Sequence, residues 1–207
     1  MAPPDGLHEI LETRRLAATT LPSRMTMRRL LADAPPPSQR STTRFWRNTA
    51  VEHLLVPLEF FLHLADAATD AVLTGYDDAL AFTDLPTTDG DVEVIVLERD
   101  RLSLDDAAFD VLLDERVAFL RRATGNIVLS VVIRTAGGPP IAIGVDGEPV
   151  AVIEDADAID TETAKATGSV LSARGFGLLA RELGLTWLPA ARGAITKLVA
   201  VDLDETL

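Results

Sequence analysis

Residues 194–207 read A-I-T-K-L-V-A-V-D-L-D-E-T-L, an apolar run followed at once by acids. The run at 195–201 is rich in β-branched residues and holds one charged side chain, Lys197, which predicts a buried parallel strand. Asp202 and Asp204 follow it directly. Because open α/β sheets bind their ligands beyond the carboxyl ends of their strands, this stretch predicts an α/β fold with polar chemistry at a strand end.

The composition is typical of a folded protein from a reducing compartment. The chain has 207 residues, of which 47% are hydrophobic, enough for a sizeable core. It has no cysteine, which excludes a disulfide framework and a thiol nucleophile and fits the cytoplasm. The sequence has no N-terminal signal and no apolar run near the roughly 20 residues of a spanning helix, so we expect no membrane partner.

The charge is strongly negative and unevenly distributed. A net charge of -13 argues against nucleic acid as a partner, because phosphates would be repelled. An arginine-rich arm at residues 1–50 predicts a contact with the acidic body or with an acidic partner, and a solvated helical face is the alternative. Its eight arginines and four acids are Arg14, Arg15, Arg24, Arg28, Arg29, Arg40, Arg44, Arg47, Asp5, Glu9, Glu12 and Asp33.

Residues 1–43 predict a helical extension followed by a proline-rich linker. Two short helices are expected within 5–34, separated near 21–23, with Ser23 placed to cap the second. Prolines at 35–37 end that helix, because proline cannot continue the hydrogen-bond ladder. We expect a linker from there to residue 43.

From Arg44 the chain alternates between apolar strands and helices, which predicts a three-layer, mostly parallel α/β sheet. The expected strands are 44–48, 72–74, 92–97, 126–133, 141–145 and 150–153. The expected helices are 51–68, one capped by Ser103 and Asp106 and ending near Arg121 and Arg122, and 168–183, after which 187–189 form a link. We expect a flavodoxin-like strand order in which 44–48 is central and ends at Asn48 and Thr49.

The acids after the last predicted strand form a recognisable motif. Asp202, Asp204 and Thr206 match D-x-D-x-T, which resembles the first motif of the haloacid dehalogenase-like superfamily. The resemblance implies that Asp202 is a nucleophile that takes up a phosphoryl group and that Asp204 is a general acid/base. It also implies one Mg²⁺, held by Asp202 and the backbone carbonyl of Asp204. A chance acidic turn is the alternative.

The superfamily requires further elements that would follow residue 207. We therefore expect 191–207 to be the first strand and motif of a catalytic domain that is truncated here. The fragment by itself is expected to lack turnover and to hold no cofactor.

The chain from Arg44 onward also resembles the N-terminal part of FkbH-like proteins, which are haloacid dehalogenase-like enzymes of subfamily IIIC. The matching pieces are Asn48-Thr49 after the first strand, Tyr76 before a loop, the run R-E-L-G-L-T-W-L-P at 181–189, and Lys197 before the acidic motif. The resemblance implies a domain like that of the SGNH hydrolases at 44–190. Glu205 stands where asparagine is common in the family.

Such a resemblance implies a role in polyketide or related biosynthesis. Members of the family are associated with dephosphorylating a phosphorylated three-carbon acyl donor and loading it on an acyl carrier protein. The expected role of this chain is a non-catalytic recognition or scaffold domain, with a crevice at Asn48, Thr49 and Tyr76. Its expected partners are an acyl carrier protein and its own C-terminal catalytic domain.

Two alternatives are a degenerate SGNH esterase or acyltransferase and a fragment of a Mg²⁺-dependent phosphatase that acts on another substrate. A working SGNH hydrolase needs a serine after the first strand and a histidine base near the end of the domain. Asn48 occupies the first position, and the histidines are His8, His53 and His63. Hydrolase activity is therefore not expected.

Overall fold

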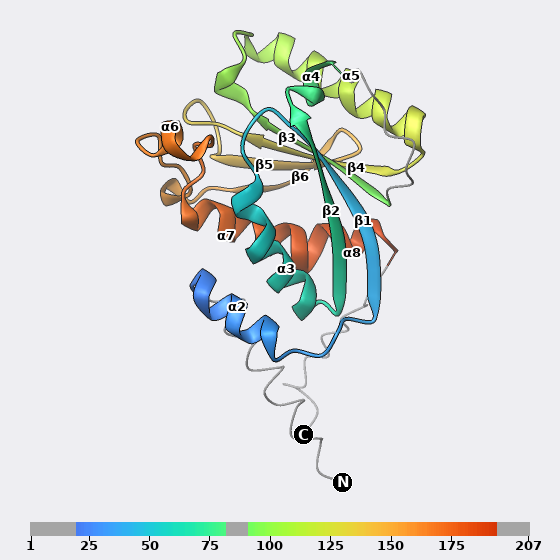
Figure 1. Cartoon of the computed structure of the whole chain (residues 1–207). Coiled ribbons are helices and arrows are strands. Elements are labelled where there is room, and N and C mark those ends of the chain that lie inside the picture. Colours follow the sequence, from blue (N-terminus) through green and yellow to red (C-terminus); the bar gives the residue numbers. More distant parts are fainter. Residues whose placement is uncertain (1–19, 82–90, 194–207) are drawn as a thin grey trace, which may run out of the picture.

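The computed structural model describes residues 20–81 and 91–193, which form one six-stranded sheet between two helical layers (Figure 1). The strand order is β2-β1-β3-β4-β5-β6. The strands are β1 (Gln39–Arg47), β2 (Ala67–Tyr76), β3 (Val92–Glu98), β4 (Ile127–Ile133), β5 (Ile141–Val145) and β6 (Glu148–Ile153). Strands β2, β1, β3 and β4 are parallel, whereas β5 and β6 are added antiparallel. The predicted α/β class and mostly parallel sheet are confirmed.

The helices divide between the two faces of the sheet. Helices α2 (Arg24–Ala32), α3 (Leu55–Leu64) and α7 (Ala173–Glu182) lie on one face, and α4 (Asp78–Ala81) and α5 (Asp106–Thr124) lie on the other (Figure 1). The short α6 (Ala164–Thr167) precedes α7, and a π-helical turn at Leu183–Trp187 joins α7 to α8 (Leu188–Ala191). No helix in the described ranges is both long and apolar enough to cross a membrane.

Strand β3 holds the two cores together, because every one of its residues is buried. Val92, Val94 and Val96 face α3 and α7, whereas Ile95 and Leu97 face α5. Alternating side chains of one strand point to opposite faces, so a continuous apolar run is typical of a strand covered on both sides. The predicted strand at 92–97 is therefore confirmed as a central one.

Charged side chains are buried between β1 and β3. Arg44 and Glu93 are register partners, and their ion pair has an N–O distance of 2.8 Å with 1% and 0% of the side chains exposed. Glu93 also accepts hydrogen bonds from Trp46 Nε1 at 2.8 Å and Asn126 Nδ2 at 3.0 Å. These partners make the burial of two charges tolerable. They also explain why the sequence of β1 looks only weakly apolar.

Several predicted boundaries are wrong. Strand β1 begins at Gln39, inside the predicted linker. It lies inside the sheet between β2 and β3, as the flavodoxin-like order predicts. Helix α3 ends at Leu64, because Ala65 and Asp66 form a turn, with Asp66 at a φ of 56°, and β2 begins at Ala67. Proline 57 lies in the first turn of α3, where it interrupts no intrahelical bond.

Two helix ends also differ from the prediction. Asp105 caps α5 by accepting a hydrogen bond from the Ala108 amide, so the expected capping box of Ser103 and Asp106 does not form. The last helix begins at Ala173 instead of residue 168, and its cap is Ser172. The expected link at 187–189 is helical and continues α7. By contrast, Ser23 caps α2 as predicted.

The predicted strand at 195–201 and its motif lie outside the described residues. The same is true of the first helix expected within residues 5–34. The strand, the motif and the helix remain predictions.

Breaking the buried pair should be costly. Arg44→Met leaves Glu93 as an uncompensated buried charge, and we expect the free energy of unfolding to fall by about 3–5 kcal/mol. Adding Glu93→Leu should recover only part of this loss, because Trp46 and Asn126 then lose their acceptor. Urea unfolding monitored by far-UV circular dichroism measures both effects.

The matched control is Arg40→Met. Its pair with Asp70 also joins a guanidinium to a carboxylate, but the two side chains are 73% and 55% exposed. The unfolding midpoint of this variant should hardly change. Equal losses for Arg40→Met and Arg44→Met would contradict the importance of burial.

Candidate functional site

The strand order places a topological switch point at the carboxyl ends of β1 and β3. From β1 the chain passes through α3 to β2 on one side, and from β3 it passes through α5 to β4 on the other. Such a point in an open parallel sheet leaves a crevice where ligands bind. Asn48 follows β1 directly, and Glu98 is the last residue of β3.

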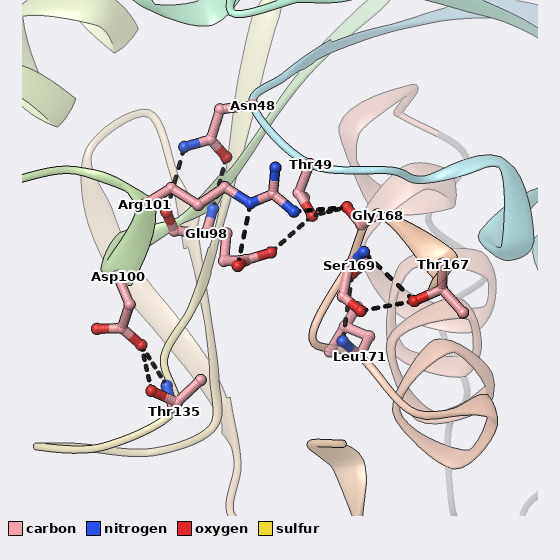
Figure 2. A network of polar contacts seen from close by, with 10 residues as sticks. All are labelled: Asn48, Thr49, Glu98, Asp100, Arg101, Thr135, Thr167, Gly168, Ser169 and Leu171. Atoms are coloured by element: carbon pink, nitrogen blue, oxygen red, sulfur yellow. Dashed lines mark hydrogen bonds and ion pairs between the residues drawn. The ribbon is translucent and has the colours of Figure 1, made fainter. Parts of the chain in front are cut away.

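Asn48 joins the two strand ends. Its Nδ2 donates to the carbonyl of Glu98 at 3.2 Å, and its Oδ1 accepts from the amide of Glu98 at 2.7 Å (Figure 2). Only 2% of Asn48 is exposed. The amide side chain is thus saturated by backbone groups, and its role in this structure is to cross-link β1 to β3.

The Glu98 carboxylate is buried in the same network. Thr49 Oγ1 lies 2.8 Å from Glu98 Oε2, and Arg101 Nε lies 3.0 Å from Glu98 Oε1. The carbonyl of Gly168 closes the network, because Arg101 Nη2 donates to it at 2.7 Å and Thr49 Oγ1 lies 3.1 Å away (Figure 2). Arg101 and the loop at 167–169 therefore fill the crevice with the protein's own groups.

Tyr76 ends β2 beside this crevice, and 51% of it is exposed. The guanidinium of Arg47 lies over its ring, 4.4 Å from the centroid. Arg47 is held in turn by Glu52 at 2.6 Å and by the carbonyl of Thr74 at 3.1 Å. A Cβ added at Gly168 would lie 3.7 Å from the Tyr76 hydroxyl, so the structure brings Tyr76 close to the loop that contacts Thr49.

Arg47 also changes the ionisation of Glu52. Burial, the largest influence, raises the pKa of Glu52, but the hydrogen bond and charge of Arg47, together with local backbone amides, outweigh it. The pKa of Glu52 consequently lies below its usual value, and the carboxylate that fixes Arg47 over Tyr76 is ionised at neutral pH.

Residues 20–81 and 91–193 hold no serine–histidine pair and no cluster of metal-ligating side chains. No serine in these ranges forms a hydrogen bond with a histidine, and no group of three His, Asp or Glu side chains there could hold a metal ion. His53 Nδ1 instead lies 3.3 Å from Arg24 Nη1. Ser172 caps α7, and Ser130 is buried in β4. A serine–histidine esterase site is not built here.

A cavity of about 570 Å³ lies on the other side of the 163–169 loop. Sequence reasoning missed it, because its walls come from three separate segments. The segments are residues 21–27 at the start of α2, residues 53–57 at the start of α3, and residues 160–177, which lead into α7. The sequence indicates this cavity only through Ser23 and Ser172, because the two helices that these serines cap begin beside it.

A solved structure has a similar fold. It is the N-terminal part of the protein BF1531 from Bacteroides fragilis, described as containing a phosphatase domain and complexed with Mg. The TM-score is 0.54 at 12% identity, and the match covers 82% of this chain and 56% of that chain. This chain thus spans little more than half of that structure. No protein-family model and no curated protein sequence matches the chain significantly. The likeness is one of fold.

The Glu52–Arg47 contact predicts a pH-dependent stability. Glu52→Gln should lower the free energy of unfolding near neutral pH by at most about 1 kcal/mol, because the side chain is 48% exposed. The folded-state pKa is depressed, so this contribution is present above about pH 4.3, the ordinary value for glutamate, and is lost as pH falls through the folded-state value.

The measurement is urea unfolding of both proteins between pH 3 and neutrality. The two curves should converge in acid. Tyr76, the single tyrosine of the chain, reports the local environment separately through its absorbance. A stability difference that grows below pH 4 would contradict this account of Glu52.

Proposed function

We propose that this chain is a non-catalytic recognition and scaffold domain of an FkbH-like enzyme. Such an enzyme dephosphorylates a phosphorylated three-carbon acyl donor and loads it on an acyl carrier protein. The observation that carries the proposal is the combination of a fold shared with a phosphatase-containing protein and a D-x-D-x-T motif at Asp202, Asp204 and Thr206.

The non-catalytic scaffold role is supported by the state of the switch-point crevice. Asn48, Thr49 and Glu98 are all at most 5% exposed and bind one another or backbone groups. Groups that are buried and saturated contribute to rigidity, whereas a nucleophile and its base must meet the substrate. In this proposal Asp202 and Asp204 carry out the chemistry, and the described sheet is a scaffold for the catalytic domain.

In the complete enzyme, Asp202 and the Asp204 carbonyl would hold Mg²⁺, since this ion prefers oxygen ligands. When bound, the ion neutralises charge on the phosphoryl group. Asp202 would then act as the nucleophile, and Asp204 would handle the proton of the leaving group.

Helix α2 offers a surface for the carrier protein. Met25, Arg28 and Arg29 are exposed at helical spacing, and Met25 is 81% exposed. On the opposite side Met27 is buried, 2% exposed, in the core beside α3, so the helix is anchored to the body. We call Met25, Arg28 and Arg29 the α2 face. A basic face with an apolar centre on a chain of net charge -13 fits an acidic partner surface.

Calorimetric titration with holo acyl carrier protein tests this role. We expect saturable binding that weakens with salt and falls at least about tenfold in the charge-reversed Arg28→Glu/Arg29→Glu variant, because like charges then face each other. Arg122→Glu, an exposed position at the end of α5 on the other face of the sheet, is the control and should bind normally. Undiminished binding by the Arg28→Glu/Arg29→Glu variant would refute the α2 face.

The second candidate is a domain of a Mg²⁺-dependent phosphatase for another substrate, and the Mg-bound structural neighbour favours it. A chain extended through the catalytic domain should then release phosphate from small phosphorylated acids in a Mg²⁺-dependent reaction without any carrier protein. Asp202→Asn should abolish this release, since the nucleophile is lost. Carrier-dependent product formation would instead favour the first candidate.

A further inference from the structure

The cavity beside α2 has the build of a ligand site that neither the fold nor the acidic motif accounts for. Its volume of about 570 Å³ lies within the range of small-molecule sites, which are concave, mostly apolar and carry a few polar groups. It does not overlap the network of Asn48 and Glu98, because the loop at 163–169 lies between them. We define it as the α2 cavity, lined by Leu21, Arg24, Met27, His53, Ala173 and Phe176 among others.

The floor of the α2 cavity is apolar and rigid. Met27 and Phe176 are 2% and 4% exposed, and both belong to the main core. The His53 ring meets Phe176 edge to face, with 5.7 Å between the centroids. An aliphatic or aromatic group of a ligand would be removed from water on this floor. Binding would cost little conformational entropy, because the side chains beneath it are already buried.

One charge at the rim is available to a ligand. Arg24 lies in the first turn of α2, and its Nη1 is 3.3 Å from His53 Nδ1. A guanidinium can only donate, so in this contact His53 Nδ1 is the acceptor. In the described ranges no carboxylate forms an ion pair with Arg24.

Of the other charged groups at the rim, Arg174 is paired, and Asp160 is held to the backbone through Oδ1 and keeps its negative charge. Arg174 forms an ion pair with Asp155 at 2.5 Å. Asp160 accepts the backbone N–H groups of Glu162 and Thr163 at 3.0 and 3.2 Å. The rim therefore presents the Arg24 guanidinium above an apolar floor, and the first turn of α2 adds the positive end of a helix dipole.

We propose that the α2 cavity binds a small amphipathic organic anion, with its apolar body on Met27 and Phe176 and its anionic head at Arg24. The ligand class is a medium-chain carboxylate or a molecule of the same shape and charge. This site is independent of the α2 face, which consists of residues on the outer side of the same helix.

Sodium octanoate is a suitable probe, and the chain contains its own reporters. Met25 and Met27 are two of only three methionines, one on the exposed α2 face and one on the cavity floor. In protein labelled with ¹³C at the methionine methyl groups, titration should shift the Met27 signal saturably and leave Met25 nearly unchanged. A Met25 shift without a Met27 shift, or no saturation, would overturn the proposal.

Three variants and a neutral ligand separate the parts of the proposal. Arg24→Gln should weaken octanoate binding about tenfold, the effect of one charge-assisted hydrogen bond, and leave 1-octanol binding unchanged. Ala173→Phe, at an exposed position on the cavity wall, should weaken both ligands by filling the space without disturbing the core. Arg122→Gln, outside the cavity, should affect neither.

Equal binding of octanoate and octanol by the unmodified protein would refute the anion site. Octanoate binding that survives both Arg24→Gln and Ala173→Phe would place the ligand elsewhere and refute the α2 cavity as its site. Because neither variant touches Arg28 or Arg29, failure of this proposal is distinct from failure of carrier binding.

Discussion

The pairing of β1 with β3 is the contact on which the rest of the structure depends. It is secured at one end by the buried ion pair of Arg44 and Glu93 and at the other by the reciprocal hydrogen bonds of Asn48 with the backbone of Glu98. Both sets of polar groups lie inside the protein, where an unpaired charge or amide is costly. These two strands can therefore pair in only one register, and this register fixes the switch point and the cavity beyond the adjoining loop.

Helix α2 belongs to the body in spite of its position in an N-terminal extension. Its buried side closes the main core through Met27, its first turn forms the rim of the cavity, and its outer side is basic. The basic outer side of these nine residues thus shares no side chain with the core and the cavity, which both use Met27. Recognition of a protein surface and of a small anion can both be altered by single substitutions in this helix, and the two effects can be measured separately.

Much of the fold follows from local patterns. The strands at 92–97, 126–133 and 141–145 were predictable from their mostly apolar sequences. The strand at 141–145 turns back at Asp146 and Gly147, both with positive φ. The start of β1 was not predictable, because its first residues are polar and at least partly exposed.

The site was predicted only in part. Asn48, Thr49 and Tyr76 do lie near one another, but Glu98 and Gly168, the hydrogen-bond partners of Asn48 and Thr49, are distant in sequence and carry no motif. The α2 cavity could not be predicted, since it exists only when three separate segments meet.

The π-helical turn at Leu183–Trp187 has a mechanical consequence. It lets α7 and α8 run as one uninterrupted rod of roughly 25–30 Å from Ser172, at the cavity, to Arg192, which donates to the Ala68 carbonyl at the opposite end of the sheet. Because helices kink chiefly at prolines and at π-helical turns, this stretch has its points of bending at Pro189 and Leu183–Trp187, between its two ends. One helical stretch thus joins the wall of the α2 cavity to the Ala68 end of the sheet.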